Sequence, residues 1–587
     1  MDNKNLFIEL ENLLRMESTY CTEDGVLLKN AIVEAALALR SELIAKLLTH
    51  DGLKRNFFTE VEGVLVFDKV KFQKFVMNKR FLPDSYTSFK NKVGLTNEDG
   101  DFLSESREVV LSWPYKDCVL EGGQTKEDAK RNEVFWNEIL APDEINRLTE
   151  PKVLTNFKRY DVDGEHEVDS ISMDDNLIIK GNNLLALHSL KRKYAGKVKL
   201  IYIDPPYNTG NDSFGYNDKF TRSSWLTFMQ NRLLIAKQLL SEDGSIFIQC
   251  DENQNSYLRV LCDKIFGEDN LMNEIIWRYR TYVGQVKDYF PKKHDTIFWY
   301  KNINRPQFHL IYEDNIEETV DYKRWNKYIV DGNKIRYGNH PETDSRFEAY
   351  LKKYIKQYGI PQQGQVIYEV NGYIIDDVWE DIIALDPKNI TERTEFTGGQ
   401  KPEALLQRII DSVTKTGDIV LDFHLGSGTT AAVAHKMGRR YLGIEQMDYI
   451  ESITMKRLKK VIGGEQGGIS QSVNWQGGGS FVYCELAKAN QQFADDIEQA
   501  SSSEELATIW EQMQETGFLS WKVNPKEIDA NADDFTTLAI EDQKRFLIEC
   551  LDKNLLYVPY SEIDNAEFGI SEKEKQINYN FYGKNRD

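Results

Sequence analysis

The sequence predicts an α/β protein built on a parallel sheet. Short apolar strands alternate with amphipathic helices between about residues 176 and 300, and again between 395 and 460. Two of these strands run directly into unusual polar loops, one beginning at Asp204 and the other at Asp422. Because the carboxyl ends of parallel strands meet at one edge of such a sheet, we expect both loops to line one ligand crevice.

The first loop follows an apolar run from Val198 to Ile203 and reads Asp204-Pro205-Pro206-Tyr207. Branched and aromatic residues suit a buried parallel strand, and prolines cannot donate hydrogen bonds to a ladder. The Asp204 carboxylate and the Pro205 carbonyl could each accept a hydrogen bond from the amino group of a planar heterocycle, while its ring stacks on Tyr207. The alternative is a strand that ends in a proline turn with a helix-capping aspartate.

The elements on either side of this loop follow a strand–helix–strand order. Asn176–Lys180 is predicted to be a strand, Gly181 and Asn182 a turn, and Leu184–Leu190 a helix. After the loop come a long helix through Met229 and Leu240, a turn at Asp243-Gly244 and a strand over Ser245–Cys250 that ends at Asp251. A helix over Ser256–Phe266 and a strand over Asp295–Tyr300 complete this half.

The second loop lies in a strand, glycine turn, helix and strand. Ile419–Asp422 is the first strand, Gly426 and Gly428 form the turn, and the strand Tyr441–Glu445 ends in an acid. Glycines allow the backbone to approach a bound nucleoside, and an acid at the end of the next strand can accept both ribose hydroxyls. The third glycine of the dinucleotide-binding fingerprint is missing.

These motifs resemble those of DNA methyltransferases that modify amino groups. Asp204-Pro205-Pro206-Tyr207 is similar to their catalytic motif, and an aspartate in first position resembles the adenine-N6 enzymes, since the cytosine-N4 enzymes more often have Ser or Thr there. The stretch from Asp422 to Thr429 resembles their loop for S-adenosylmethionine. The resemblance implies that the catalytic residues are Asp204, Pro205, Pro206 and Tyr207. It implies that the cofactor-binding residues include Asp422, Phe423, Gly426, Gly428, Thr429 and Glu445.

Three further residues are candidates for the cofactor site. Gln400-Lys401-Pro402 resembles the family's lysine–proline motif, which implies that Lys401 pairs with the methionine carboxylate of the cofactor. The alternative for Lys401 is a surface lysine before a helix. Gly181 and Asn182 are candidates to line the cofactor's adenine, and an ordinary strand-to-helix turn explains them equally well.

The order of the motifs and further stretches of the chain indicate which group of amino-group DNA methyltransferases the sequence resembles. The catalytic motif precedes the cofactor motif, which is the circularly permuted "beta" order. Leu53–Phe58, Val64–Phe67, Lys116–Leu120 and the block from Asn176 to Gly210 are similar to the modification (Mod) subunits of Type III restriction-modification systems. That resemblance implies double-stranded DNA as substrate, a homodimer, and a helicase-nuclease (Res) subunit as partner.

The predicted domains follow from these boundaries. Residues 1–150 form a mainly helical domain, 151–300 the catalytic half of the methyltransferase core and 395–462 its cofactor half. Residues 301–394 break the strand–helix rhythm, are rich in tyrosine, and are expected to be an inserted target-recognition domain. Residues 463–587 form an acidic domain for subunit contacts.

The net charge of −21 argues against nucleic acid binding by the whole surface. From Ile462 onward, however, 23 acids face 10 Lys and Arg, so the last fifth of the chain carries 13 of the 21 excess charges. A DNA surface must then be a local basic patch. The candidates are Arg278, Arg280, Lys292 and Lys293, just before the inserted region.

Several classes of protein are disfavoured. No apolar leader, no run of 18 apolar residues and no paired cysteines occur, so we expect a cytoplasmic protein without a metal site. No Pro-Cys pair for cytosine-C5 chemistry and no Walker A sequence are present. The prediction is an adenine-N6 DNA methyltransferase that flips its target base. The alternatives are a stand-alone adenine enzyme, an RNA or cytosine-N4 methyltransferase, and a catalytically silent DNA-binding subunit.

Overall fold

The computed structural model describes residues 3–76, 148–208, 222–279, 291–385 and 391–583, apart from short gaps at 16, 18, 22–26, 62, 397–398, 520–522, 524, 531 and 553–554. Within 77–147 it describes four two-residue strands, and within 280–290 Asp288 and Phe290. The predicted DNA-contact residue Arg280 and the segment Lys116–Leu120 lie outside the described residues. No helix in the described part of the chain is long and apolar enough to cross a bilayer.

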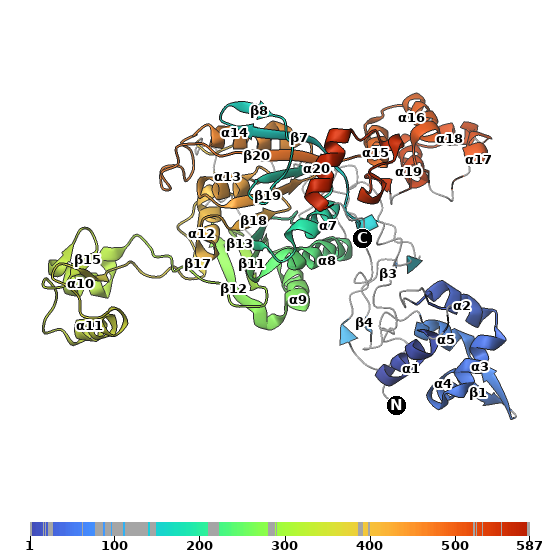
Figure 1. Ribbon diagram of the computed structural model, residues 1–587, viewed down its shortest axis with the longest axis horizontal. Coiled ribbons are helices and arrows are strands. Elements are labelled where there is room, and N and C mark those ends of the chain that lie inside the picture. The colour runs from blue at the N-terminus through green and yellow to red at the C-terminus, as the bar shows by residue number, and fades with distance from the viewer. Residues whose placement is uncertain are drawn as a thin grey trace.

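One large mixed sheet forms the centre of the molecule (Figure 1). Its strands, in spatial order, are β17 (Val378–Trp379), β12 (Leu271–Arg278), β13 (His294–Lys301), β11 (Leu240–Cys250), β10 (Val198–Ile203), β18 (Ile419–Asp422), β19 (Arg440–Glu445), β9 (Leu177–Lys180), β20 (Phe481–Leu486), β7 (Leu154–Asp161) and β8 (Gly164–His166). The strands from β11 to β20 run parallel, and β13 and β7 flank them antiparallel. The predicted α/β fold is confirmed.

The two faces of the sheet are covered by different helices. On one face α7 (Asn183–Tyr194), α8 (Arg222–Leu239), α9 (Asn255–Phe266) and α20 (Glu572–Tyr582) pack on alternate strand residues such as Ile201 and Ile203. On the other face α12 (Glu403–Val413), α13 (Thr429–Lys436) and α14 (Lys456–Ile462) pack on Leu200 and Tyr202. Strands that are apolar on both faces are buried from both sides, which is why they read as continuous apolar runs.

Local details differ from the prediction at three strands. The expected turn at Asp243-Gly244 lies inside β11, because the ladder with β10 skips from Val198–Leu240 to Leu200–Ser245 and residues 241–244 bulge out. β12 and β20 are strands that the sequence analysis did not predict. Since β20 belongs to the central sheet, the boundary predicted at 463 cuts through the core.

The inserted region carries a small unit with its own core. A three-stranded sheet of β14 (Ile329–Val330), β15 (Lys334–Arg336) and β16 (Val366–Glu369) packs with α10 (Val320–Trp325) and α11 (Ser345–Tyr358) around the buried Trp325. Two extended segments join it to the core, and they pair at Tyr312 and Ile374. In Figure 1 this unit stands away from the main body. We refer to residues 313–373 as the inserted module.

The two ends of the chain form further helical units. The N-terminal unit has α1 (Asn3–Arg15), α2 (Lys29–Leu37), α3 (Ser41–Thr49), α4 (Asp51–Phe57), α5 (Lys69–Val76) and the hairpin β1 (Phe58–Val61) and β2 (Val64–Phe67) around one core. The C-terminal unit has α15 (Asn490–Gln499), α16 (Ser503–Thr516), α17 (Pro525–Ala530), α18 (Ala532–Thr537) and α19 (Ile540–Cys550). The last helix, α20, returns to the sheet, where the Asn578 side chain bonds both the N–H and the carbonyl of Leu154 at 2.8 and 2.7 Å.

Candidate active site

A single cavity joins the two predicted loops at the carboxyl edge of the sheet. Asp204, Pro205, Pro206 and Tyr207 line one side, and Asp422, Gly426, Thr429 and Glu445 line the other. The two loops meet because β10 and β18 are neighbours, with Leu200 beside Val420 and Ile201 beside Leu421. The site is therefore created by strand order, although four of the eleven strands of the sheet, β11, β12, β13 and β17, lie between the two motifs in the chain.

One oxygen of the Asp204 side chain has no hydrogen-bond partner among the described residues. Asp204 Oδ1 is buried and accepts no hydrogen bond from any residue that the structure describes, whereas Oδ2 accepts from Lys401 Nζ at 2.5 Å. The Pro206 carbonyl is used inside the protein, because Trp225 Nε1 donates to it at 2.7 Å. A buried unpaired carboxylate oxygen costs free energy, and such an atom in a cavity points to a donor on a ligand.

The glycine loop is shaped by backbone conformations that favour glycine. Gly426 has φ +53° and Gly428 has φ +79°. A Cβ on Gly428 would lie 2.8 Å from Thr454 Cγ2, and one on Gly426 would lie 3.4 Å from Phe396 Cζ. Thr454, in a π-helical turn over Ile450–Met455, also donates its hydroxyl to the Gly426 carbonyl at 2.6 Å. The loop is thus held close to the π-helical turn behind it.

Asp422 fixes the start of this loop. Its Oδ1 accepts from the His424 N–H at 2.9 Å and its Oδ2 from the Thr430 hydroxyl at 2.6 Å. Burial raises the pKa of Asp422 to about 7, even though these two hydrogen bonds lower it. The carboxyl therefore acts on the chain itself, joining the strand end to the first turn of α13.

Glu445 closes the cavity at the end of β19. Its Oε2 accepts from the Gly426 N–H at 2.8 Å, and its Oε1 accepts from the N–H groups of Gln446 and Met447 at 2.9 and 3.0 Å. Burial raises the pKa of this carboxyl, and the backbone hydrogen bonds oppose the shift. The Tyr449 side chain also hydrogen-bonds Glu445 and lowers its pKa, so a ligand hydroxyl would have to share or replace this contact.

Several predicted residues lie elsewhere than expected. Phe423 is fully buried in the core and lies outside the cavity lining, where the neighbouring His424 is found instead. Gly181 donates its N–H to the Glu445 carbonyl, and Asn182 caps α7 by accepting from Leu184 N at 3.0 Å. Neither residue lines the cavity, so the turn interpretation accounts for both.

Sequence reasoning also missed residues that do line the cavity. Phe396 and Tyr449 lie against each other with ring centroids 5.1 Å apart, and Met447 and His424 complete this apolar side. The signal that could have found Met447 and Tyr449 is their position directly after the strand-end acid Glu445. Flat and apolar side chains beside an acid suit a purine nucleoside.

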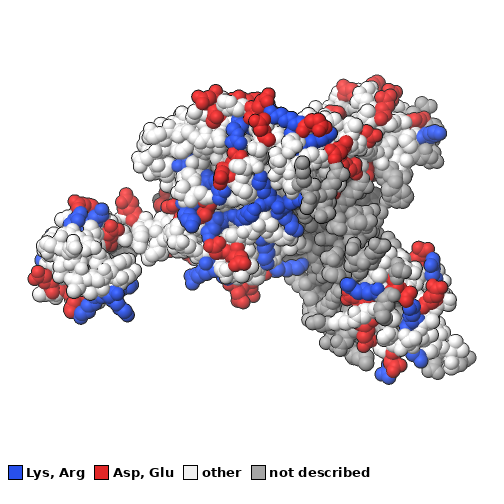
Figure 2. All heavy atoms as spheres, in the orientation of Figure 1, with Lys and Arg blue, Asp and Glu red and all other residues white. Residues whose placement is uncertain are grey.

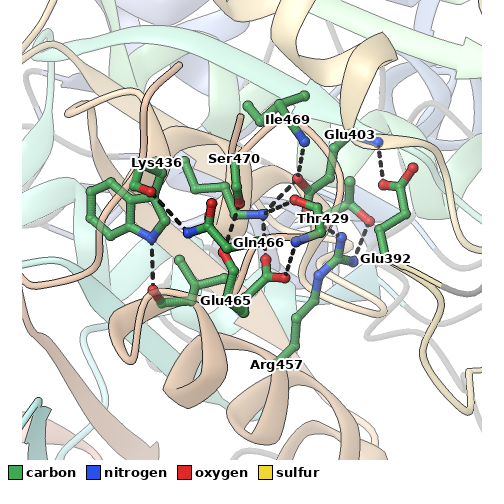
Figure 3. Close-up of polar contacts among 12 residues, drawn as sticks. Glu392, Glu403, Thr429, Lys436, Arg457, Glu465, Gln466, Ile469 and Ser470 are labelled. Carbon is green, nitrogen blue, oxygen red and sulfur yellow. Dashed lines mark hydrogen bonds and ion pairs between the residues drawn. The ribbon is translucent and has the colours of Figure 1, made fainter. Parts of the chain in front are cut away.

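A buried group of charges supports the cavity from behind (Figure 3). Glu403 accepts from Arg457 and from Lys436, both at 2.8 Å, and the Lys436 and Glu403 side chains are almost completely buried. Arg457 in turn donates to the Thr429 hydroxyl at 2.8 Å, and that hydroxyl donates to the Lys401 carbonyl at 3.2 Å. The group therefore connects the first residue of α12 with both loops of the cofactor half.

Three of the four predicted DNA-contact residues, Arg278, Lys292 and Lys293, lie at the same edge of the sheet. Arg278 ends β12 opposite His294, next to Lys292 and Lys293. Arg278 forms an ion pair with Glu380 at 2.5 Å, and Lys292 forms one with Glu252 at 2.6 Å. About half of the Arg278 side chain and more than half of the Lys292 side chain are exposed. Figure 2 shows Lys and Arg gathered over the central body and many acidic residues over the C-terminal helices. The negative net charge is thus unevenly spread.

Comparison with known proteins identifies the family. A family model described as DNA methylase matches residues 198–456, and one described as Type III restriction/modification enzyme methylation subunit matches residues 41–95. Among solved structures, the cytosine-N4-specific PvuII DNA methyltransferase aligns with 49% of this chain and 87% of its own at 13% identity and a TM-score of 0.31.

Two curated relatives are Type III Mod subunits. The Mod subunit of EcoPI from Escherichia phage P1 is 30% identical over 44% of this chain and 55% of its own. A Haemophilus influenzae protein, named as a probable Type III restriction-modification enzyme HindVI Mod subunit, is 37% identical over 97% of both chains. The chain described here accordingly belongs to the Mod subunits of Type III restriction-modification systems, a family of DNA methyltransferases.

Proposed function

We propose that this protein transfers a methyl group from S-adenosylmethionine to N6 of adenine in double-stranded DNA. The observation that carries the proposal is the buried Asp204 Oδ1, which has no hydrogen-bond partner among the described residues, in the cavity that the glycine loop also lines. Such an oxygen can accept a hydrogen bond from the amino group of a target base, and a cofactor in the same cavity would lie beside that base. Family membership supports DNA as the substrate.

The donor groups in the cavity fit S-adenosylmethionine. Glu445 could accept from the ribose hydroxyls, Phe396 and Tyr449 could contact the adenine, and Lys401 could turn from Asp204 to the cofactor carboxylate. The bound cofactor would supply an electrophilic methyl group on a sulfonium. The positive φ angles of Gly426 and Gly428 favour glycine at both positions, and a Cβ on Gly428 would also lie 2.8 Å from Thr454 Cγ2, so the backbone of this loop stays bare toward the cavity that both glycines line or adjoin.

The catalytic loop would act on the target base by position and charge. Adenine N6 is a weak nucleophile, since its lone pair is delocalised into the ring. Asp204 Oδ1 and the Pro205 carbonyl would hold its two amino protons and favour a pyramidal nitrogen, while Tyr207 stacks on the ring. The base must first leave the duplex to reach this buried loop. An aspartate in first position supports adenine over cytosine as the target.

The remaining parts of the chain suggest a division of labour. We assign target recognition to the inserted region 301–394, because it has its own fold and joins the core near Arg278 and the strand ends. The acidic C-terminal unit and the N-terminal unit would make subunit contacts, with a second copy of this chain and with a Res helicase-nuclease. Methylation of chromosomal DNA would place the protein in the cytoplasm.

One experiment tests the reaction and the target base together. Purified protein is incubated with unmethylated plasmid DNA and S-adenosylmethionine, and the DNA is digested to nucleosides for mass spectrometry. N6-methyladenine is the expected product. N4-methylcytosine would reassign the target base, and the absence of any methylated nucleoside would leave the chain as a DNA-binding subunit. Adding a Res subunit and assaying cleavage tests the partner separately.

A further inference from the structure

Asp295, the second residue of β13, is a buried carboxylate that contacts the catalytic loop from outside its motif. Its exposed fraction is 4%, and both oxygens accept hydrogen bonds. Oδ2 accepts from the Tyr207 hydroxyl at 3.1 Å and from Gln249 Nε2 at 2.7 Å, and Oδ1 accepts from the Tyr279 hydroxyl at 3.2 Å. Asp295 is thus the point at which three strand ends and the loop meet.

The residues that hold Asp295 are themselves fixed. Gln249, on β11, accepts from the Tyr202 hydroxyl at 2.7 Å through Oε1, which orients its amide so that Nε2 faces Asp295. Tyr202 and Gln249 are fully buried inside the sheet. A side chain whose partners lie in the loop after β10, on β11 and just after the end of β12 has little freedom to move.

The hydrogen bond to Asp295 holds the Tyr207 ring at its hydroxyl, the end opposite Cβ. Tyr207 belongs to a loop, and a ring held only by its Cβ would sample several orientations. The hydrogen bond to Asp295 selects one of them, and the loss of freedom occurs on folding rather than on substrate binding. A platform that is already oriented binds a planar base with less entropy loss.

We propose that Asp295 is a positioning residue for the target base, holding the Tyr207 ring in the orientation that stacks on it. The role rests on the proposed function, since it requires a base in the cavity. What Asp295 contributes is a hydrogen-bond acceptor and not its negative charge. The nearest charged groups, Asp204 and Lys401, already form an ion pair with each other.

The choice of substitution separates these two contributions. Asp295→Asn keeps one acceptor oxygen for Tyr207 and Gln249, and its amide can donate to the Tyr279 oxygen, so it removes only the charge. Asp295→Ala removes the acceptor as well. Tyr207→Phe removes the same hydrogen bond from the other side while keeping the ring. Asp251→Ala is the matched control, because Asp251 is a buried acid at the same sheet edge whose side chain bonds Asn253.

The measurement is kcat and KM for methyl transfer to unmethylated plasmid DNA, with cofactor affinity by calorimetry. We expect Asp295→Ala and Tyr207→Phe each to raise the KM for DNA about tenfold, as the loss of one oriented hydrogen bond would, with cofactor affinity unchanged. The double variant should be no worse than Asp295→Ala alone, because Asp295→Ala already removes the hydrogen bond that Tyr207→Phe removes. Asp295→Asn and Asp251→Ala should stay within about twofold of the wild type.

Three outcomes would overturn the proposal: an unchanged KM in Tyr207→Phe, additive effects in the double variant, or a defect in Asp295→Asn as large as in Asp295→Ala. The last result would assign the effect to charge. If Asp295→Ala does not fold, Tyr207→Phe and Asp295→Asn decide the question alone. A wild type that makes no N6-methyladenine refutes the proposed function instead, so the two failures are distinct.

Discussion

Lys401 Nζ lies 2.5 Å from Asp204 Oδ2 and 5.1 Å from the centre of the Tyr207 ring. The same ammonium group thus contacts both side chains to which we assign the target base. The sequence predicted Lys401 at the cofactor carboxylate, and the structure shows it hydrogen-bonded to Asp204. If Lys401 turns from Asp204 to the cofactor carboxylate, as proposed above, cofactor binding and capture of the base should be coupled.

This coupling can be measured with Lys401→Gln. Loss of a hydrogen bond to a charged group should weaken S-adenosylmethionine binding by about 1.5–3 kcal/mol, because the cofactor carboxylate loses its partner. Base capture in the absence of cofactor should become easier than in the wild type, since the ammonium no longer covers Tyr207. Calorimetry gives the first quantity, and fluorescence of 2-aminopurine in the target position gives the second. Unchanged values for both would separate Lys401 from the two sites.

Asp204→Ala should abolish turnover while leaving the cofactor bound. The substitution removes an acceptor that matters most as the amino nitrogen becomes nucleophilic, so the loss should appear in kcat. Lys401 also loses its ion-pair partner and becomes available to the cofactor. Methyl transfer and calorimetry on the same preparation test this. Wild-type rates of N6-methyladenine formation in Asp204→Ala would refute the central assignment.

At the strand-end acid, we expect Glu445→Gln to weaken S-adenosylmethionine binding by about 1–2 kcal/mol, as loss of a charge-assisted acceptor would. Glu445→Ala is a poorer test, because it leaves three backbone N–H groups without their acceptor and lowers stability. Gly426→Asp places a side chain at φ +53° beside Phe396 and should also reduce binding. Equal affinities in wild type, Glu445→Gln and Gly426→Asp would remove this loop from the cofactor site.

Removing the buried charge of Glu403 should lower the free energy of unfolding of the protein. Glu403→Ala leaves Arg457 and Lys436 without their shared partner, at a cost of about 3–5 kcal/mol. Burial raises the pKa of Glu403, but the positive charges of Arg457 and Lys436 lower it by more than burial raises it. The pKa of Glu403 is therefore below the ordinary value of 4.5.

A lowered folded-state pKa fixes the pH dependence of this contribution. Glu403 contributes its full stability above the pKa of the unfolded chain, and this contribution is lost as pH falls through the folded-state pKa. Wild type and Glu403→Ala should therefore differ most in Tm above pH 5, and the difference should shrink below about pH 4.5. A constant difference over this range would assign the effect to packing. The exposed pair of Lys352 and Glu348 provides the control, because Glu348→Ala should change Tm little.

Replacing the inserted module should change which DNA sequence is methylated and leave the methyl-transfer reaction unchanged. Replacing residues 313–373 with the matching segment of a related enzyme should change the methylated sequence but not the modified base, because within the described residues two arm segments near Tyr312 and Ile374 join it to the core. Sequencing of DNA methylated by the chimera identifies the new site. An unchanged site would move recognition to the core, for example to Arg278 and Lys292.

The sequence predicted what local pattern determines and missed what depends on strand order. Val198–Ile203 and Ile419–Asp422 are strands because their apolar runs are buried on both faces. β12 was missed because Leu271–Arg278 mixes polar and apolar residues toward the end of the sheet, where burial is incomplete. The structure places His424 rather than Phe423 in the cavity lining, and it brings Asp295 into contact with Tyr207. Both arrangements depend on how neighbouring strands end. A linear pattern holds no record of that.

The adjacency of β10 and β18 has a consequence for the growing chain. β10 can pair with β11 soon after synthesis, but its other edge stays open until Ile419–Asp422 and the strand after it have left the ribosome. An apolar strand edge exposed for that long is a site for misassembly with other chains. The inserted module, with its own core, can fold during this interval. Its independent folding would keep residues 313–373 from competing for the open edge of β10.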